Sequence, residues 1–249
     1  MTIENYLLDH SYLFILLTGL IGFFVGYLLN IIIYRLPLVI EAENYQIALE
    51  ILGTTSPTRS AKPRPFTKRI LLSRYLVVEL ITCALSVILA IHFGPSLQLL
   101  CAWLLTFALI TLFFIDNDTM LLPDQITLPI LWLGLFFNIF SVFTPITDAV
   151  LGAIFGYLFF YLMAYLMLKI RKTHGLGGGD LKLISLLGAW FGWQILPIII
   201  FIASFTGALF AAFYIFFKKE KVTLQIPFGP FLTFAGFLIL LWGRTLYHY

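Results

Sequence analysis

Charged residues are scarce in this chain of 249 residues. Only 11% of the residues are Asp, Glu, Lys or Arg, whereas a soluble domain typically has about 25%. Because 61% of the residues are hydrophobic, a soluble protein of this length could not remove so much apolar surface from water. The composition therefore predicts an all-α, polytopic membrane helix bundle formed by one membrane-embedded domain over residues 1–249.

Cysteine and histidine are also rare, and their spacing matches no metal site. Cys83 and Cys101 fall in apolar runs without another cysteine or histidine at ligand spacing. We therefore expect small buried side chains at both positions and no metal site. A cleavable signal peptide is not expected either, because no basic region precedes the first apolar run.

Apolar runs separated by turn signals predict eight transmembrane helices. Their expected ranges are 12–33, 76–93, 97–115, 126–143, 150–168, 183–191, 195–217 and 228–242. The last apolar stretch before residue 217 is longer than one crossing needs, so we divide it at Gly192, which leaves a short sixth segment. Pro37 is expected to stop the first helix, and a separate interfacial helix over 42–52 is expected to end at Gly53.

Basic residues fall almost entirely on one side of this arrangement. Of the fifteen Lys and Arg residues, seven lie within 35–74, four within 169–182 and three within 218–221. Only Arg244 falls on the other side. The positive-inside rule then places these three segments in the cytoplasm and both termini on the opposite side. Residues 38–74 are thus predicted to be a cytoplasmic loop region between the first two spans, not an independent domain.

Two acidic residues, Asp116 and Asp180, lie at the predicted cytoplasmic ends of apolar segments. A charge in such a position is costly, which favours a functional role. Two adjacent carboxyl groups cannot both ionise easily and share one proton. One can then accept a proton from water while the other donates a proton to a carbonyl oxygen. We predict that Asp116 and Asp180 form such a pair, although a helix N-cap would also account for Asp180.

Four glycines, Gly175, Gly177, Gly178 and Gly179, precede Asp180. We expect them to adopt backbone geometry that other residues resist and to leave room for an extended peptide, with Asp180 at the start of a helix. Lys182 could then pair with a lipid phosphate or with the substrate. A nucleotide-binding loop is disfavoured, because Gly-Lys-Ser/Thr is absent and the G-x-G-x-x-G spacing fails.

The acidic residues allow other interpretations. Asp118 and Asp124 could equally be helix caps or turn residues. A proton-coupled membrane transporter that uses Asp residues as a relay is the alternative function. We see no internal repeat with matching broken helices, and the carboxylates lie at the ends of spans. Both features favour hydrolysis over transport.

Two motifs resemble those of bacterial type IV prepilin peptidases. Residues 114–118, with 121–129, are similar to the first active-site motif of that family. Residues 177–182 resemble the GxGD signature of intramembrane aspartyl proteases. The similarity continues in residues 29–31, 35–37, 74–80, 187–190, 192–194 and 226–230, and covers nearly the whole chain except about 39–73.

The resemblance implies an aspartic endopeptidase of the bacterial inner membrane. Its active site would face the cytoplasm, with Asp116 and Asp180 as the catalytic pair and both termini in the periplasm. The expected substrates are type IV prepilins and type II secretion pseudopilins, whose short basic leader is removed after a glycine. Asp118 and Asp124 would meet that leader. Membrane lipid is the other expected partner, nucleic acid is not one, and proteolysis needs no cofactor.

Loop region 38–74 departs from the family pattern. Members usually bind zinc there through two Cys-x-x-Cys pairs, and this loop contains no cysteine, so zinc is not expected. Many members also methylate the new N-terminal residue with S-adenosylmethionine. The sequence leaves open whether this chain retains that activity. If it does, S-adenosylmethionine is the expected cofactor, with no binding residues assigned.

Overall fold

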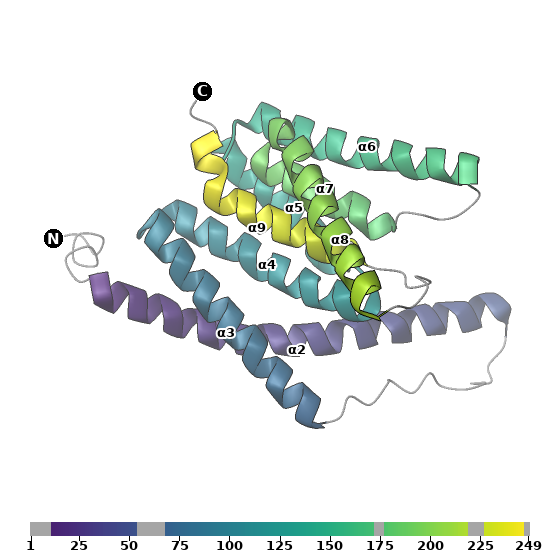
Figure 1. Cartoon of the computed structure of the whole chain (residues 1–249), viewed down its shortest axis with the longest axis horizontal. Coiled ribbons are helices and arrows are strands. Elements are labelled where there is room, and N and C mark those ends of the chain that lie inside the picture. Colours follow the sequence, from purple (N-terminus) through teal and green to yellow (C-terminus); the bar gives the residue numbers. More distant parts are fainter. Residues whose placement is uncertain (1–10, 54–67, 172–176, 219–226, 247–249) are drawn as a thin grey trace. The chain divides into compact units, whose positions relative to one another are not determined.

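The computed structural model describes residues 11–53, 68–171, 177–218 and 227–246, and the regular elements in these ranges are all helices (Figure 1). They are α2 (Ser11–Leu52), α3 (Lys68–Phe93), α4 (Leu97–Thr119), α5 (Asp124–Ile139), α6 (Ile146–Arg171), α7 (Gly178–Phe191), the 3-10 turn η1 (Trp193–Ile195), α8 (Leu196–Lys218) and α9 (Gly229–Leu246). Five of these helical segments are long and apolar enough to cross a membrane. The all-α prediction is confirmed for the described residues, and the five apolar segments are consistent with a membrane bundle. The count of eight spans stays a prediction.

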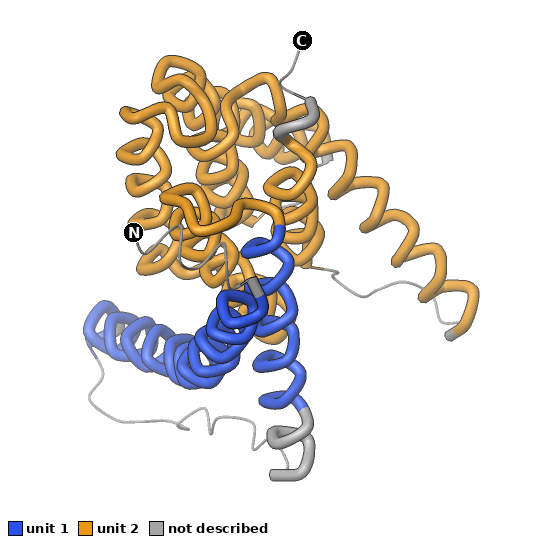
Figure 2. Tube along the Cα trace, turned by 90° about the vertical axis from the view of Figure 1, so that its left-hand side faces the viewer, with its two compact units in different colours: residues 1–91 blue, residues 92–249 orange. Residues whose placement is uncertain are grey.

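The chain divides into two compact units, Met1–Ile91 and His92–Tyr249 (Figure 2). In the first unit, glycines let α2 approach α3 closely. A Cβ atom on Gly22 would lie 2.6 Å from Ser86 Oγ, and one on Gly26 would lie 2.7 Å from Glu79 Cα. The prediction of one domain over 1–249 is not tested by this division.

The first helix does not stop at Pro37, contrary to our prediction. α2 continues through Pro37 to Leu52, so residues 42–52 extend it and do not form a separate helix. A proline inside a helix removes one backbone hydrogen bond, at a cost of about 3 kcal/mol. Proline is tolerated in membrane helices, where neighbouring groups and small backbone adjustments compensate for the lost bond. Gly53 ends α2 as predicted, with φ +62° and its N–H donated to Glu50 O over 3.2 Å.

α7 is the central helix of the second unit. It contacts α5, α6, α8 and α9, and all its residues from Leu183 to Phe191 are buried. The Trp190 indole Nε1 donates to Ile130 O over 2.8 Å, and its ring lies where Gly134 has no side chain. This short helix of 14 residues is therefore enclosed by other helices of its unit.

One buried amide connects α5 with the end of α7. Asn138 Nδ2 donates to the backbone oxygens of Ala189 and Trp190, at 2.9 and 3.1 Å. Its Oδ1 accepts the N–H groups of Phe143 and Thr144, at 3.1 and 3.2 Å. Because Asn138 satisfies these N–H groups, the chain can leave the helix, and α5 ends at Ile139 and not at residue 143 as predicted.

The predicted division of the long apolar stretch at Gly192 is confirmed. Gly192 has φ +84°, a value that favours glycine, and its N–H donates to Gly188 O over 2.8 Å. α7 ends there, and η1 with α8 follows. The glycine therefore separates the enclosed α7 from α8, which has many exposed apolar side chains.

Candidate active site

Asp116 lies in the last turn of α4, and only 4% of its surface is exposed. The helix ends because Met120 adopts a left-handed conformation with φ +55°, and its N–H donates to Asp116 O over 2.9 Å. The next two residues, Asn117 and Asp118, are exposed. The local helix geometry thus directs Asp116 inward and its two neighbours outward.

Asp180 is the third residue of α7, and 8% of its surface is exposed. Its backbone N–H donates to Gly177 O over 3.1 Å, and the Gly177 N–H donates to the Asp180 carboxyl group. The bond from the Gly177 N–H is the half of a capping box that an acid in the third helical position makes, and Gly177 has no side chain to make the other half. The helix start predicted for Asp180 is confirmed, and the helix dipole favours a carboxylate there.

The structure places the two carboxyl groups close enough to interact. Burial first, and then the charge of Asp116, raise the pKa of Asp180 to about 7, while the Gly177 N–H acts in the opposite direction. Asp180 lies in the first turn of α7, outside the five helical segments that are long enough to cross a membrane. Near neutral pH, Asp180 therefore retains a proton that an ordinary aspartic acid would have lost.

Gly177, Gly178 and Gly179 do not adopt unusual backbone geometry, so this expectation is wrong for them, and Gly175 lies outside the described residues. Gly177 has φ −70° and ψ 139°, and Gly178 and Gly179 are helical. The reason for a glycine at 179 is space, because a Cβ atom would lie 2.6 Å from Leu122 Cβ. A Cβ atom on Gly178 would have no neighbour within 4 Å. Close packing against the segment after α4 therefore explains Gly179 alone.

Lys182 pairs with an acid of the same site. Its Nζ lies 2.6 and 2.7 Å from the two carboxylate oxygens of Asp124, the first residue of α5. Both side chains are partly exposed. The sequence predicted lipid phosphate or substrate as partners of Lys182 and did not indicate this ion pair. The pair joins the start of α5 to the first turns of α7 beside Asp180.

Gly229, the first residue of α9, is a site residue whose role the sequence analysis missed. Its backbone N–H donates to the Asp116 carboxyl group, and a Cβ atom on it would lie 2.5 Å from Asp116 Oδ2. That oxygen is buried and has no hydrogen-bond partner in the structure. In the sequence, residues 226–230 stand out only through the family resemblance, and their proline–glycine pattern is the one signal of such a role.

The described residues contain no group of three or more His, Cys, Asp or Glu side chains placed to hold a metal ion. The central part of loop region 38–74 lies outside the described residues, so its predicted lack of zinc stays a prediction. Within the described site, two buried carboxyl groups, one of them with a pKa near neutral, can exchange protons with a bound amide.

Comparison with known proteins gives one family. Residues 103–212 match the model of the "Type IV leader peptidase family". Curated proteins named "Prepilin leader peptidase/N-methyltransferase" are similar over nearly their whole length. The protein from Aeromonas salmonicida is 36% identical over 94% of this chain and 93% of its own. The Pseudomonas aeruginosa protein is 37% identical over 98% of this chain and 95% of its own.

A third relative, from Pseudomonas putida, is 35% identical over 99% of this chain and 97% of its own. That alignment extends over 279 residues, more than the 249 of this chain, so the relative carries segments that this chain lacks. No solved structure shows significant similarity to the chain.

Proposed function

The chain belongs to the type IV leader peptidase family and is a prepilin peptidase, and we propose that Asp116 and Asp180 are the acids that cleave its substrates. The observation that carries this proposal is that both carboxyl groups are buried, and that burial first, and then the charge of Asp116, raises the pKa of Asp180 to about 7. They come from helices that are distant in sequence, α4 and α7. Two carboxyl groups that hold one proton supply both a base and an acid.

In the proposed reaction, each of the two carboxyl groups accepts a proton once and donates a proton once. Asp116, unprotonated, accepts a proton from a water molecule whose oxygen attacks the carbonyl carbon of the scissile amide. Asp180 donates its proton to the carbonyl oxygen, and a tetrahedral diol forms. Asp116 then gives its proton to the leaving nitrogen as the C–N bond breaks, and Asp180 regains a proton from the diol. The pair returns to its starting state without a cofactor.

The proposed substrates are prepilins and pseudopilins, cut at the cytoplasmic face of the inner membrane. The distribution of basic residues in the sequence supports that orientation. Asp118 is exposed and lies two residues after Asp116, so it can meet a basic leader. Asp124 can do the same, with its charge partly offset by Lys182. We propose both acids as the leader contact, and membrane lipid surrounds the bundle.

We propose a second activity, N-methylation of the new N-terminal residue with S-adenosylmethionine, because the names of the relatives include an N-methyltransferase. S-adenosylmethionine would supply the methyl group. We assign no residue of this chain to that cofactor and no step to it. We also propose that the segments that the relatives have and this chain lacks fall in region 38–74, where the zinc-binding cysteines are missing.

Separate Asp116→Asn and Asp180→Asn variants test the peptidase proposal. Each should lower the rate of leader removal by about 10²- to 10⁴-fold, because each removes one proton-transfer group. The measurement is the initial rate with a purified prepilin in detergent. Asp148→Asn is the control, because Asp148 lies in the first turn of α6 and contacts Trp193, away from the pair.

Two results would contradict the proposal or its control, provided that the variant protein is folded. If an Asn variant accumulates in the membrane like the parent enzyme and still removes the leader at the parent rate, that acid is not catalytic. If Asp148→Asn loses the same activity, the loss reflects the general removal of a carboxylate and not the pair.

A further inference from the structure

A buried acidic side chain of the first unit, Glu79, has no part in the proposed cleavage. It lies on α3, within the segment Arg74–Phe93 that is long and apolar enough to cross a membrane, and only 8% of its surface is exposed. Its carboxyl group forms no hydrogen bond or ion pair with another described residue. A carboxylate buried in a transmembrane helix is costly without a cationic partner, and such residues usually serve a function.

Close packing of α2 against α3 holds Glu79 at the interface of these two helices. A Cβ atom on Gly26 would lie 2.7 Å from Glu79 Cα, so the two backbones are in contact at this level. One turn further along α2, Asn30 Nδ2 donates to Tyr75 O over 3.1 Å. Tyr75 lies one turn before Glu79 on α3. The amide of Asn30 and the carboxyl group of Glu79 therefore lie within about one helical turn of each other.

The Asn30 amide and the Glu79 carboxyl group together offer hydrogen-bond acceptors. The Asn30 N–H group is used on the backbone, and its Oδ1 accepts no hydrogen bond from a described residue. The Glu79 carboxylate adds two acceptor oxygens and a negative charge. An ammonium group has three N–H donors and no acceptor, so it matches this set in both charge and hydrogen bonding. A phosphate or a second carboxylate would be repelled.

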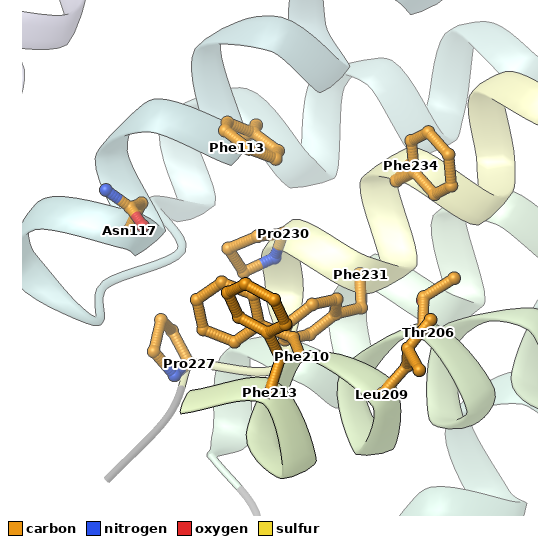
Figure 3. A pocket seen from close by; sticks show the side chains of 10 residues that line it. All are labelled: Phe113, Asn117, Thr206, Leu209, Phe210, Phe213, Pro227, Pro230, Phe231 and Phe234. Atoms are coloured by element: carbon orange, nitrogen blue, oxygen red, sulfur yellow. The ribbon is translucent and has the colours of Figure 1, made fainter. Parts of the chain in front are cut away.

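A groove between α4, α8 and α9 is a second possible binding site, and it does not suit a cation. Figure 3 shows its lining, in which Asn117 and Thr206 are the polar side chains and the other eight are apolar. None of these ten side chains is acidic. An ammonium group in the groove would lose its hydration without gaining a carboxylate. Of these two places, the interface at Glu79 is the one that fits an ammonium group.

We propose that Glu79 and Asn30 bind the α-ammonium group that cleavage creates at the new N-terminus of the substrate. This inference rests on the proposed N-methylation, because the nitrogen of this group is the one that receives the methyl group. In the predicted topology, the first turns of α3 and the last turns of α4 lie on the same side of the membrane, because residues 94–96 connect the other ends of these helices. The amine is therefore released and bound at the same face.

Binding of a mature pilin peptide tests the site without either reaction. The probe is a synthetic peptide with the N-terminus that cleavage creates, compared with the same peptide after N-acetylation, which removes the charge. The unmodified enzyme should bind the free amine about tenfold or more tightly. Glu79→Gln keeps the size of the side chain but not its charge, and should bind both peptides equally. Glu50→Gln makes the same change at an exposed position of α2 and should keep the preference.

Asn30→Ala is a second variant, which keeps the carboxylate and removes one acceptor. It should lower the preference for the free amine severalfold. Mass spectrometry of the products adds another readout. With a full-length prepilin and S-adenosylmethionine, Glu79→Gln should leave most of the N-termini that it releases unmethylated, whereas Glu50→Gln should methylate as the parent enzyme does. Thermal unfolding in detergent shows whether each variant is folded.

Three results would overturn the proposal. The first is a parent enzyme that binds both peptides equally. The second is an unchanged preference for the free amine in folded Glu79→Gln or Asn30→Ala. The third is a rise in KM for leader removal by Glu79→Gln that disappears when the basic residues of the leader are replaced by Gln. That result would assign Glu79 to the leader and not to the new N-terminus.

Failure of this proposal and failure of the proposed reactions look different. If the chain does not methylate, the parent enzyme releases only unmethylated pilin but still prefers the free amine. If the amine assignment is wrong, the parent enzyme methylates its product and Glu79→Gln does so equally. If the peptidase proposal is wrong, Asp116→Asn still removes the leader, and binding of the mature peptide is unchanged.

Discussion

At the scale of single residues, the pKa of Asp180 sets how the site responds to pH. Burial and the charge of Asp116 both favour its protonated form and raise its pKa from 3.8 to about 7. We therefore expect the rate of leader removal to fall as pH rises through about 7, because the acid then loses the proton that it donates. Initial rates across mildly acidic to alkaline buffers measure this limb, with thermal unfolding at each pH as the control for stability. A rate that stays constant well into the alkaline range contradicts the assignment.

Substitution of Gly229 tests whether the position of the Asp116 carboxyl group matters, because both acids remain in the protein. Gly229→Ala adds a methyl group 2.5 Å from Asp116 Oδ2 and must displace that carboxyl group. A displacement of about 1 Å lowers enzymatic rates by about a hundredfold, so we expect a loss of that size in leader removal while both acids remain. Gly178→Ala is the matched control, because its added methyl group has no neighbour within 4 Å. Equal activity of the two variants would show that Gly229 does not position Asp116.

At the scale of elements, the contacts of α7 determine where Asp180 lies. At Gly152 and Gly188, α6 and α7 approach so closely that a Cβ atom on either glycine would overlap the backbone of the other helix. Ser185 Oγ adds a hydrogen bond of 2.7 Å to Ala153 O. Such contacts fix the helix in position along its length, and with it the carboxyl group at its start.

Removal of the Asn138 side-chain amide is expected to lower the stability of the protein strongly. Asn138→Ala leaves the carbonyls of Ala189 and Trp190 and two backbone N–H groups without this partner, and we expect about 3 kcal/mol of lost stability. Asn117→Ala makes the same change at an exposed position and should leave the unfolding temperature unchanged. Thermal unfolding in detergent measures both. A small loss for Asn138→Ala would indicate that water replaces the amide.

At the scale of the whole molecule, the distribution of basic residues predicts the orientation in the membrane. Fourteen of fifteen Lys and Arg residues belong to segments assigned to one side, which the positive-inside rule places in the cytoplasm. We expect a membrane-impermeant maleimide to label Ser141→Cys in cells whose outer membrane is permeabilised, because Ser141 is exposed beyond the end of α5. Thr58→Cys, within 38–74, should react only after the inner membrane is disrupted.

The parent enzyme, which has Cys83 and Cys101, is the background control for that labelling. The reverse pattern, with Thr58→Cys labelled first, would place Asp116 and Asp180 on the periplasmic side. It would then remove the basis for cleavage in the cytoplasm.

The sequence alone was sufficient for properties that depend on neighbouring residues. Long apolar runs predicted the helices, Gly192 predicted the break before η1, and the boundaries of α4 and α8 agree closely with the predicted ranges. The two candidate acids were also visible, because a carboxylate at the end of an apolar run is rare and costly. Local patterns failed at Pro37, where the backbone bonds of a long helix outweigh the loss of one bond.

Only the tertiary structure decided which distant residues touch. The contact of Gly229 with Asp116, the ion pair of Lys182 with Asp124, and the groove beside Asn117 each join segments that are far apart in the sequence. The hydrophobic pattern determines that a helix forms and lies in the membrane, but it does not specify a partner, because lipid and protein are equally apolar surroundings for these side chains. Close packing at glycines and buried hydrogen bonds supply that choice, and they exist only once the helices have assembled.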